Sequence, residues 1–455
     1  MAYDYEETCT RVAAFIEKER DTFVRPWSDL VAQPSISSTG EGIGECCSML
    51  VGMMREIGID AHVRHIDPHP VITGSLGSNP AKPTILLYAH YDVQPVGQME
   101  LWQSDPFVPE IRGDVLYGRG AADNKSPLAA HLMAAKLLVR EFGNDLPVNL
   151  KFIFEGCEEA GSRGLPGFLK DHAAELRADF VFLSDGPKNE KKLPIIALGA
   201  KGCLHIDLEL TALKQDAHSR YAPILPNAAW RMVALLNELK HKDKVLVPGF
   251  YDDVIPPSAE ECALMNELPP VDEEIERIYG ALPIYPQDEG YYVHLNMTPT
   301  FNISQIHSGH GAGVVPAVAR ASLDIRLVEG QSADSVYEKI CRHIRNIGYD
   351  DVKVVRRSSV EPSKTPLDSP WVEIVRRVTG DVYGDYVLYP CRPSSAPDYL
   401  WTKILGLPVI QVRWSDADSN NHAPNEHQSI SGYLQGIELT FRLALAVGMA
   451  ATSSR

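Results

Sequence analysis

Acidic and histidine side chains follow predicted strands in the first half of the chain. His90-Tyr91-Asp92 comes directly after an apolar run that ends at Ala89, and Asp185 comes shortly after another that ends at Leu183. Neutral imidazole and carboxylate groups are ligands that Zn²⁺, Mn²⁺ and Co²⁺ accept. His90 could therefore bind a metal ion while Asp92 orients its imidazole through the other ring nitrogen. For this motif alone, a structural histidine at a strand end is the more frequent explanation.

Two glycine-bounded loops carry further carboxylates. In residues 118–125 the glycines permit tight turns that present Asp123 just before a predicted helix. A carboxylate at this position could bridge two cations, although an N-cap aspartate is the simpler interpretation of this loop alone. In residues 155–162, Glu158 and Glu159 are adjacent, so in extended backbone they point opposite ways. One could bind metal and the other act as a general base, with a solvated acidic loop as the alternative.

These motifs lie in the loops of an alternating strand and helix pattern. The predicted strands are residues 60–65, 71–75, 84–89, 149–154 and 179–183, and the predicted helices are residues 41–57, 126–142 and 165–176. This alternation predicts an α/β domain with a mainly parallel sheet that is covered on both faces. In such sheets, ligands bind outside the carboxyl ends of the strands, where the motifs fall.

The pattern changes at about residue 199 and returns at about residue 364. Residues 203–211 and 319–327 alternate apolar and polar side chains, which predicts half-exposed antiparallel strands. Residues 240–297 are rich in proline and acidic residues and are predicted to be irregular. We therefore predict a catalytic domain made of residues 1–198 and 364–455, interrupted by a smaller α+β domain of residues 199–363.

Composition restricts the class of protein and its partners. The formal net charge of -17 argues against nucleic acid and against an anionic membrane as a partner. No uninterrupted apolar run reaches the roughly 18 to 20 residues that span a bilayer. Met1 to Glu7 is acidic and lacks the apolar region of a signal peptide, and the eight cysteines include no CxxC pair. We expect a cytoplasmic protein with free thiols.

Several motifs, taken in order, resemble the M20 family of co-catalytic metallopeptidases, in its branch of carnosinase-like and other dipeptidases. The resemblance spans residues 31–445. It rests on YAHYDVQPV (88–96), GRGAADNK (118–125), EGCEEAGS (155–162), LSDG (183–186), the pair HS (218–219) and NHAPNE (421–426). Six separate motifs in one order make the resemblance specific, because a chance match to one motif would not reproduce the order.

The resemblance implies a dinuclear metal site in an aminopeptidase-like catalytic domain. The implied cofactors are two divalent ions per subunit, zinc in the first place, with manganese or cobalt as alternatives. The implied ligands are His90, Asp123 and Asp185 for one ion, and Asp123, Glu159 and His422 for the other. Glu158 is implied to be the general base, and Asp92 to support His90. The implied activity is hydrolysis of the amide bond of a dipeptide or similar small peptide by a hydroxide held between the ions.

The resemblance also implies roles for the inserted domain, as a lid and as the interface of a homodimer. His218 is implied to stabilise the oxyanion in the partner's site, and Arg326 and Asn302 to contact substrate. The chain departs from the family pattern at Arg220, at Glu329 and in the loop that begins at Arg392.

These departures concern the substrate and leave the implied ligands intact. Arg392 and Arg326 could each bind a substrate carboxylate, with a surface or interface ion pair as the alternative. An N-acyl-amino-acid amidohydrolase is the second enzymatic interpretation. A non-catalytic binding protein is a third, and the complete set of implied ligands and base argues against it.

Overall fold

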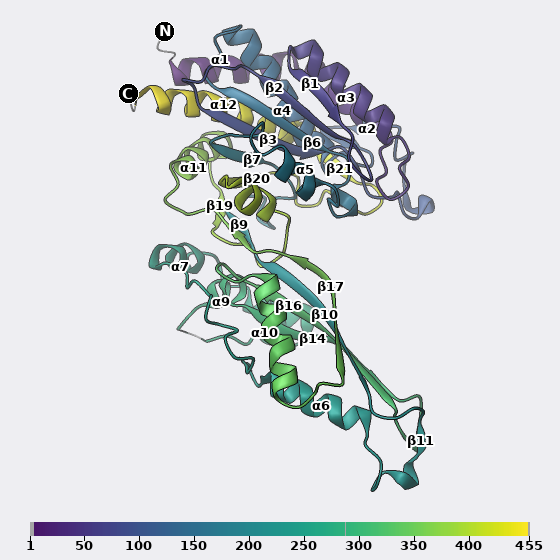
Figure 1. Ribbon diagram of the computed structural model, residues 1–455. Helices are drawn as coiled ribbons and strands as arrows, with labels where there is room; N and C mark the ends of the chain where they lie inside the picture. The colour runs from purple at the N-terminus through teal and green to yellow at the C-terminus, as the bar shows by residue number, and fades with distance from the viewer. Residues whose placement is uncertain (1–3, 287, 454–455) are drawn as a thin grey trace. The chain divides into compact units, whose positions relative to one another are not determined.

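The computed structural model describes residues 4–286 and 288–453, so Met1 to Tyr3 of the acidic N-terminal segment lie outside the described residues. Contacts divide the chain into two compact units (Figure 1). Unit 1 contains the chain up to Leu198, Thr365–Pro390, and the chain from Leu400 onward. Unit 2 contains Gly199–Lys364 and Cys391–Tyr399. Unit 1 is therefore assembled from segments on both sides of a long insertion.

Unit 1 is built on an eight-stranded mixed sheet of order β1-β2-β6-β3-β7-β20-β8-β19. The strands are β1 (Asp60–Arg64), β2 (Val71–Leu76), β3 (Thr84–His90), β6 (Asn149–Glu155), β7 (Phe180–Leu183), β8 (Ile195–Ala197), β19 (Val387–Tyr389) and β20 (Val409–Arg413). The central strands β6, β3, β7 and β20 run parallel to one another. Ile85, Leu86 and Leu87 are consecutive and all buried, so both faces of β3 are covered. The α/β fold class predicted from the alternating pattern is confirmed.

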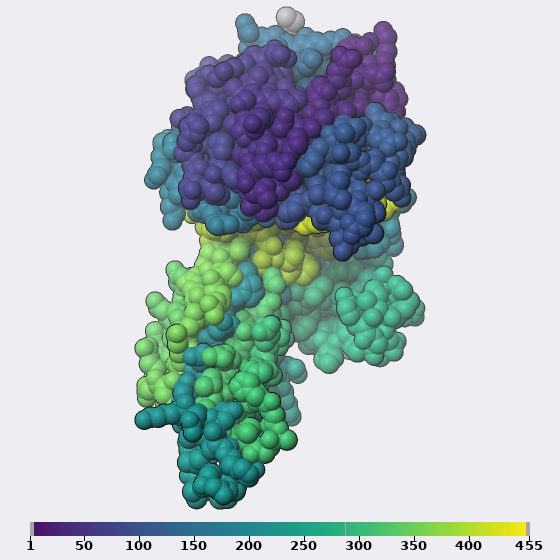
Figure 2. All heavy atoms as spheres, turned by 90° about the vertical axis from the view of Figure 1, so that its right-hand side faces the viewer, coloured from purple at the N-terminus to yellow at the C-terminus, as the bar shows by residue number. Residues whose placement is uncertain are grey.

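Helices cover this sheet, and the two ends of the chain come together among them (Figure 1). The helices of unit 1 are α1 (Tyr5–Lys18), α2 (Arg20–Ala32), α3 (Ile43–Ile57), α4 (Lys125–Phe142), α5 (Leu165–Asp171), α11 (Pro370–Tyr383) and α12 (Ile430–Ser453). Trp27 of α2 stacks on Tyr433 of α12, with ring centroids 4.6 Å apart. In Figure 2 the N-terminal part of the chain, in purple and blue, forms most of the visible face of unit 1. The C-terminal segment, in yellow, shows only in small gaps.

Among the described residues, one helix is long and apolar enough to cross a membrane by length and composition. This helix is residues Ile430–Ala451 of α12. This finding differs from our expectation that no apolar segment is long enough to span a membrane. Glycine, threonine and two charged residues interrupt the apolar side chains of this helix, so no uninterrupted apolar run marks it in the sequence. Within unit 1, 67% of its most apolar window is buried, and it packs on α4 and α11. Its apolar character therefore serves the core of unit 1.

Unit 2 is a four-stranded antiparallel sheet with helices on one face. The strand order is β14 (Thr300–Ser308), β16 (Val318–Leu327), β10 (Gly202–Thr211) and β17 (Val352–Val360). Helices α6 (Ala228–Leu239) and α10 (Ala333–Asn346) pack on the face that carries Leu204, Ile206 and Leu208. The opposite face carries His205, Asp207 and other polar side chains, so β10 shows the predicted alternation.

Short strands complete both units. A three-stranded sheet joins β4 (Glu110–Arg112), β5 (Val115–Tyr117) and β21 (His427–Ser429). Two-stranded pairs form between β9 (Gly199–Ala200) and β18 (Ser363–Lys364), between β11 (Ala217–His218) and β15 (Val314–Val315), and between β12 (Lys240–His241) and β13 (Lys244–Val245). The pairing of β21 with β5 brings the segment after residue 420 next to the first third of the chain.

The segment predicted to be irregular contains three helices. They are α7 (Ala259–Asn266), α8 (Asp272–Tyr279) and α9 (Tyr291–Met297). The Ser258 side chain accepts a hydrogen bond from the backbone N–H of Glu261, whose side chain accepts one from the backbone N–H of Ser258. This capping box starts α7 in a stretch whose apolar residues show no helical period. Strand β14 was also not predicted, because most of its residues are exposed and no apolar alternation marks it.

Residues 391–399 group with unit 2, although we predicted that the catalytic domain contains all of residues 364–455. The backbone of Arg392 forms a parallel bridge with Ala200, and its N–H donates to the carbonyl of Gly199. Ser395 accepts a hydrogen bond from Arg326 at 2.9 Å. Backbone pairing to the start of the insertion therefore removes this loop from unit 1.

One buried histidine makes the stability of unit 1 depend on pH. His131 of α4 is 1% exposed, and its Nδ1 lies 3.1 Å from Thr440 Oγ1. Its ring packs edge-on against Phe182, and its Nε2 has no hydrogen-bond partner among the described residues. Burial lowers the pKa of His131 to about 3.

We expect the melting temperature to fall as the pH decreases from about 6.5, because unfolded His131 gains a proton there and folded His131 does not. The His131→Leu variant should show a shallower fall than wild type down to about pH 4. The measurement is thermal unfolding in excess chelator, with exposed His62→Gln as control. Parallel pH profiles of wild type and His131→Leu would contradict the assignment.

Candidate metal centre

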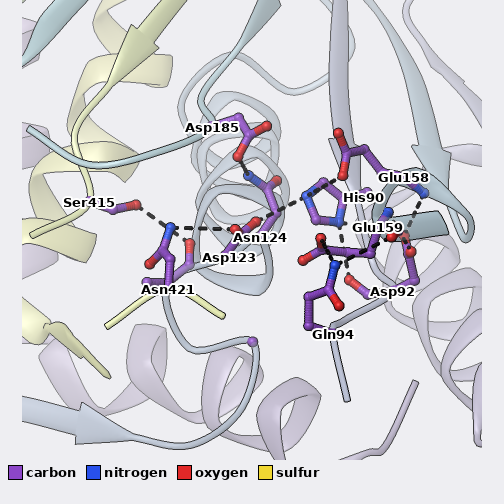
Figure 3. A network of polar contacts seen from close by, with 12 residues as sticks. His90, Asp92, Gln94, Asp123, Asn124, Glu158, Glu159, Asp185, Ser415 and Asn421 are labelled. Carbon is purple, nitrogen blue, oxygen red and sulfur yellow. Dashed lines mark hydrogen bonds and ion pairs between the residues drawn. The ribbon is translucent and has the colours of Figure 1, made fainter. Parts of the chain in front are cut away.

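Three adjacent parallel strands deliver side chains to one edge of the unit 1 sheet. His90 is the last residue of β3 and is fully buried. Glu158 and Glu159 begin a short 3₁₀ helix after β6, whereas we expected extended backbone there, and Asp185 lies two residues beyond β7. Because β6, β3 and β7 are neighbours in that order, the carboxyl ends of the strands bring these side chains together (Figure 3).

Two loops complete the cluster from other parts of unit 1. Asp123 lies in the tight turn before α4 and is 9% exposed. His422 lies in the loop between β20 and β21, and its backbone has a φ of 62°. Asn420 and Asn425 in the same loop also have left-handed backbone, which asparagine tolerates better than most residues. The His422 side chain is 53% exposed, so little packing around it holds the imidazole in place. The backbone conformation of its loop therefore determines where the imidazole lies.

The carboxylate of Asp123 lies between two histidines. Its Oδ1 is 3.1 Å from Nε2 of His90, and its Oδ2 is 3.1 Å from Nε2 of His422. His422 Nε2 is also 3.2 Å from Glu159 Oε2. Each oxygen of one carboxylate thus faces a different imidazole, which is the arrangement that a carboxylate shared between two cations needs.

The described residues contain two groups that could each hold a metal ion. The first is His90, Asp123 and Asp185, and the second is Asp123, Glu159 and His422, with the candidate ligand atoms of each group within 4.8 Å of one another. Glu159 Oε1 is buried and has no hydrogen-bond partner among the described residues, and the buried His90 Nε2 faces the carboxylates of Asp123 and Glu158 without a well-formed hydrogen bond. Such atoms are costly to leave unpaired, so a cation fits the chemistry of both groups.

The pKa values show that negative charge is concentrated here. Burial raises the pKa of Asp185 to about 6, and the charge of Asp123 adds to the effect. Burial also raises the pKa of Glu158 well above its usual value, where the nearby charge of His90 opposes the shift and that of Asp185 adds to it. Hydrogen bonds to Asp123 and Glu159 raise the pKa of His422 to about 10. Without a cation, imidazolium groups therefore have to balance the carboxylates.

Asp92 contacts more than the histidine that we expected it to orient. Its Oδ1 is 3.5 Å from His90 Nδ1, which lies closer, at 3.1 Å, to the Asp92 backbone carbonyl. The Asp92 carboxylate also accepts hydrogen bonds from the backbone N–H groups of Glu158, at 3.1 Å, and Glu159, at 3.0 Å. One buried carboxylate thus holds the His90 loop and the Glu158–Glu159 turn in register.

Sequence reasoning did not single out two amide side chains that hold candidate ligands. Gln94 Nε2 donates to Glu159 Oε2 at 2.9 Å, and Asn124 Nδ2 donates to Asp185 Oδ1 at 3.3 Å (Figure 3). Their only signal in the sequence is their place within the motifs of residues 88–96 and 118–125. Each gives the ligand carboxylate a hydrogen bond that fixes its orientation.

Unit 2 carries the remaining predicted residues. His218 ends β11 and is exposed. Asn302 of β14 is the cross-strand partner of Asp324 in β16, and the Asp324 carboxylate lies 3.2 Å from Arg326 Nε. Asn302 and Arg326 are therefore neighbours on one sheet.

Arg392 is also in unit 2 but is largely buried. Its Nη2 donates to Asp398 Oδ2 at 2.7 Å, so Arg392 forms an ion pair, but a buried one and not the surface or interface pair that we considered as the alternative.

Comparisons with known proteins agree with this geometry. The profile of Peptidase family M20/M25/M40 matches residues 86–446. The chain is 30% identical to human Beta-Ala-His dipeptidase, covering 81% of this chain and 76% of that protein. It is 27% identical to the Cys-Gly metallodipeptidase dug1 of Schizosaccharomyces pombe, covering 93% of this chain and 95% of that protein.

Solved structures match nearly the whole chain. The M20 family metallo-carboxypeptidase Sso-CP2 from Sulfolobus solfataricus superimposes with a TM-score of 0.80 at 32% identity, covering 94% of this chain and 99% of that chain. Human carnosine dipeptidase 1 gives a TM-score of 0.70 at 26% identity, covering 97% of this chain and 99% of that chain. With the profile match over most of its length, the chain belongs to peptidase family M20/M25/M40, the family whose motifs the sequence resembles.

Proposed function

We propose that this protein is a metal-dependent dipeptidase that hydrolyses the amide bond of a dipeptide or similar small peptide at a dinuclear centre. The observation that carries the proposal is the carboxylate of Asp123, whose two oxygens face His90 and His422 in two overlapping ligand groups. The set of nitrogen and oxygen donors without thiolate suits zinc, with manganese or cobalt as alternatives.

A pair of divalent ions in these groups would polarise the amide carbonyl and make a nucleophile available from water at neutral pH. The residues around the ions then have distinct tasks. Glu158 is the general base: its Oε2 lies 4.0 Å from His90 Nε2, and its side chain is 22% exposed. Its raised pKa suits a group that accepts a proton from water and returns it to the leaving amine. Asp92 holds the backbone of Glu158, so the base stays beside the ligands.

Dipeptides are our proposed substrates because two relatives that align with most of the chain are named as dipeptidases, of Cys-Gly and of Beta-Ala-His. We further propose that His218, Arg326, Asn302 and Arg392 of unit 2 contribute to substrate binding and that unit 2 is a lid. Arg326 forms a two-point ion pair with Asp324 through Nε and Nη2, which is the ion pair considered as the alternative, and its Nη1 donates to Ser395, so its guanidinium is fixed in one orientation. A fixed guanidinium matches a carboxylate such as the C-terminus of a peptide.

We propose a homodimer that forms through unit 2. Strand β14 is an edge of the sheet and exposes Ile303 and Ile306, at 45% and 54%. The adjacent helix α6 exposes Trp230 and Val233, at 74% and 47%. An edge strand beside exposed apolar side chains is a surface that a second copy can extend and cover.

We also propose a cytoplasmic location, in a reducing compartment. All eight cysteines are free, and six of them are buried. The net charge of -17 supports the absence of nucleic-acid and anionic-membrane partners.

The proposal is tested with zinc-loaded or manganese-loaded protein on a panel of dipeptides and N-acyl amino acids. We expect dipeptide cleavage and little deacylation. Glu158→Gln should keep its metal and lose about 10²- to 10⁴-fold in kcat, the usual contribution of a general base. His422→Ala should bind one ion fewer. Near-normal turnover by Glu158→Gln, or a preference for N-acyl amino acids, would contradict the proposal.

Metal binding should release protons. The pKa of His422 is about 10 in the metal-free protein, and only neutral imidazole binds metal. Metal affinity should therefore increase with pH between 6 and 9, by about tenfold per pH unit for each proton released. Calorimetric titration in two buffers of different ionisation enthalpy measures the release. Equal heats in both buffers would show that His422 is already neutral or does not bind the ion.

The dimer proposal predicts that charge on its surface separates the subunits. The variant Trp230→Glu/Ile306→Lys should raise the dimer dissociation constant at least about 30-fold, because losing an interface hot spot costs about 2 kcal/mol. Sedimentation velocity measures the change. Met99→Glu, which places a charge on an exposed apolar position of unit 1, is the control. A double variant that remains as dimeric as this control would exclude α6 and β14 as the interface.

A further inference from the structure

Glu426 is a fully buried carboxylate at the end of the loop that carries His422. Its Oε2 accepts hydrogen bonds from Arg119 Nη1 at 2.7 Å and from the backbone N–H of Gly120 at 2.9 Å. Its Oε1 accepts from the backbone N–H of Ala122 at 3.0 Å and from that of Asp123 at 2.9 Å. Four donors thus converge on one side chain, and three of them belong to the backbone of the turn that presents Asp123.

Further hydrogen bonds hold the same loop from neighbouring residues. The carbonyl of Glu426 accepts a hydrogen bond from the backbone N–H of Gly118 at 3.0 Å. Asn425 Oδ1 accepts from the backbone N–H of Gln103 at 2.7 Å, and Asn425 Nδ2 donates to the carbonyl of Leu101 at 2.9 Å. The loop of His422 is therefore joined to the turn of Asp123 although the two are far apart in the sequence.

The two candidate ligand groups differ in how much they depend on these hydrogen bonds between the loop of His422 and the turn of Asp123. His90 is part of β3, and the Asp185 carbonyl accepts a hydrogen bond from Gln411 of the neighbouring strand β20 at 2.6 Å. His422 has no strand to hold it, and its backbone is left-handed. Asp123 belongs to both groups, but the relative position of Asp123 and His422 matters only for the second group. That relative position is what Glu426 fixes.

We propose that Glu426 is a positioning residue that sets the affinity of the ion held by Asp123, Glu159 and His422. Glu426 does not touch the ion: it fixes the backbone of Asp123 directly and the loop of His422 through the chain. This inference rests on the proposed dinuclear centre. When a group that orients a metal ligand in this way is lost, metal affinity typically falls by about 10- to 100-fold.

A simpler role is that Glu426 only neutralises the buried Arg119. Arg119 is 1% exposed, but it has two other contacts: Nη2 donates to the Pro95 carbonyl at 3.1 Å, and its guanidinium carbon lies 5.5 Å from the Trp102 ring centroid. The two roles separate in variants, because only positioning requires the backbone donors of the Asp123 turn.

The experiment measures the two metal affinities of chelator-stripped full-length protein by competition with a chromophoric chelator, together with its melting temperature. In Glu426→Gln the amide oxygen can still accept two of the four hydrogen bonds. The amide NH₂ group then faces the other two N–H donors and cannot accept from them. We expect one of the two affinities to fall about 10- to 100-fold and the other to stay within about threefold. Arg119→Met should lower the melting temperature and keep both affinities, because the three backbone donors still hold Glu426.

Asp114→Asn is the matched control. The Asp114 carboxylate also pairs with an arginine, Arg20, and accepts from the backbone N–H of Ser431 at 3.3 Å in the same C-terminal segment. It should keep both metal affinities at the wild-type level. A loss in this control equal to that in Glu426→Gln would show a general effect of destabilising the C-terminal segment, which overturns the proposal.

The double variant Arg119→Met/Glu426→Gln decides between the roles and carries the test if Glu426→Gln alone does not fold. A persistent loss at one ion supports positioning. Recovery of wild-type affinity, or two unchanged affinities in folded Glu426→Gln, overturns the proposal. Wild-type protein that binds fewer than two ions would instead refute the dinuclear centre itself, so the two failures are distinguishable.

Discussion

Unit 1 has to hold several carboxylates close together although their negative charges repel one another. Asp123 approaches both His90 and His422 to 3.1 Å, and Glu158, Glu159 and Asp185 crowd around the same point. Burial, together with repulsion from the charge of Asp123, raises the pKa of Asp185 to about 6. A divalent cation in each group, as we propose, would turn this repulsion into attraction. The surrounding fold must therefore hold the side chains in place without adding much further negative charge.

The protein holds them mainly with backbone and neutral amide groups. Parallel strands fix His90 through main-chain pairing, and uncharged amide donors of Gln94 and Asn124 bind the candidate ligand carboxylates. Asp92 is a carboxylate among these supporting groups, and backbone N–H groups of the Glu158–Glu159 turn donate hydrogen bonds to it. Neutral donors can stabilise a carboxylate without competing with a metal cation for it. A lysine or arginine side chain would compete.

The sequence was sufficient to predict the parts of this arrangement that are local. Strand β3 is visible as an apolar run, and His90 at its end is an expected place for a ligand. The pairing of distant motifs, such as that of Asp123 with His422, was accessible only through the resemblance to a family. Nothing in the spacing of those two residues shows that they approach, because β21 pairs with β5 only in the folded protein.

Other features escaped prediction because long-range hydrogen bonds create them. Glu426 stood within a recognised motif, but its four donors lie about 300 residues away along the chain, so its role cannot be derived from its neighbours in sequence. Strand β14 has few buried side chains, and the alternation that reveals β10 is absent from it. In the loop of residues 391–399, Arg392 pairs with the start of the insertion through backbone groups, which leave no sequence signal.

Two buried glutamates show how unit 1 limits charge around the centre. Glu426 is paired with a guanidinium and three backbone donors, so its charge is compensated where it lies. Among the described residues, the carboxylate of Glu155 at the end of β6 accepts hydrogen bonds only from the hydroxyls of Tyr88 and Ser162, at 2.8 and 3.1 Å.

Burial, together with the charge of Asp92, raises the pKa of Glu155 to about 7, so a large share of this side chain is uncharged at neutral pH. Glu155, the neighbour of His90 on the adjacent strand, therefore accepts hydrogen bonds at a smaller electrostatic cost than a fully ionised carboxylate. Burial raises the pKa of both glutamates, but of the two only Glu426 has a guanidinium and backbone N–H donors that stabilise its ionised form.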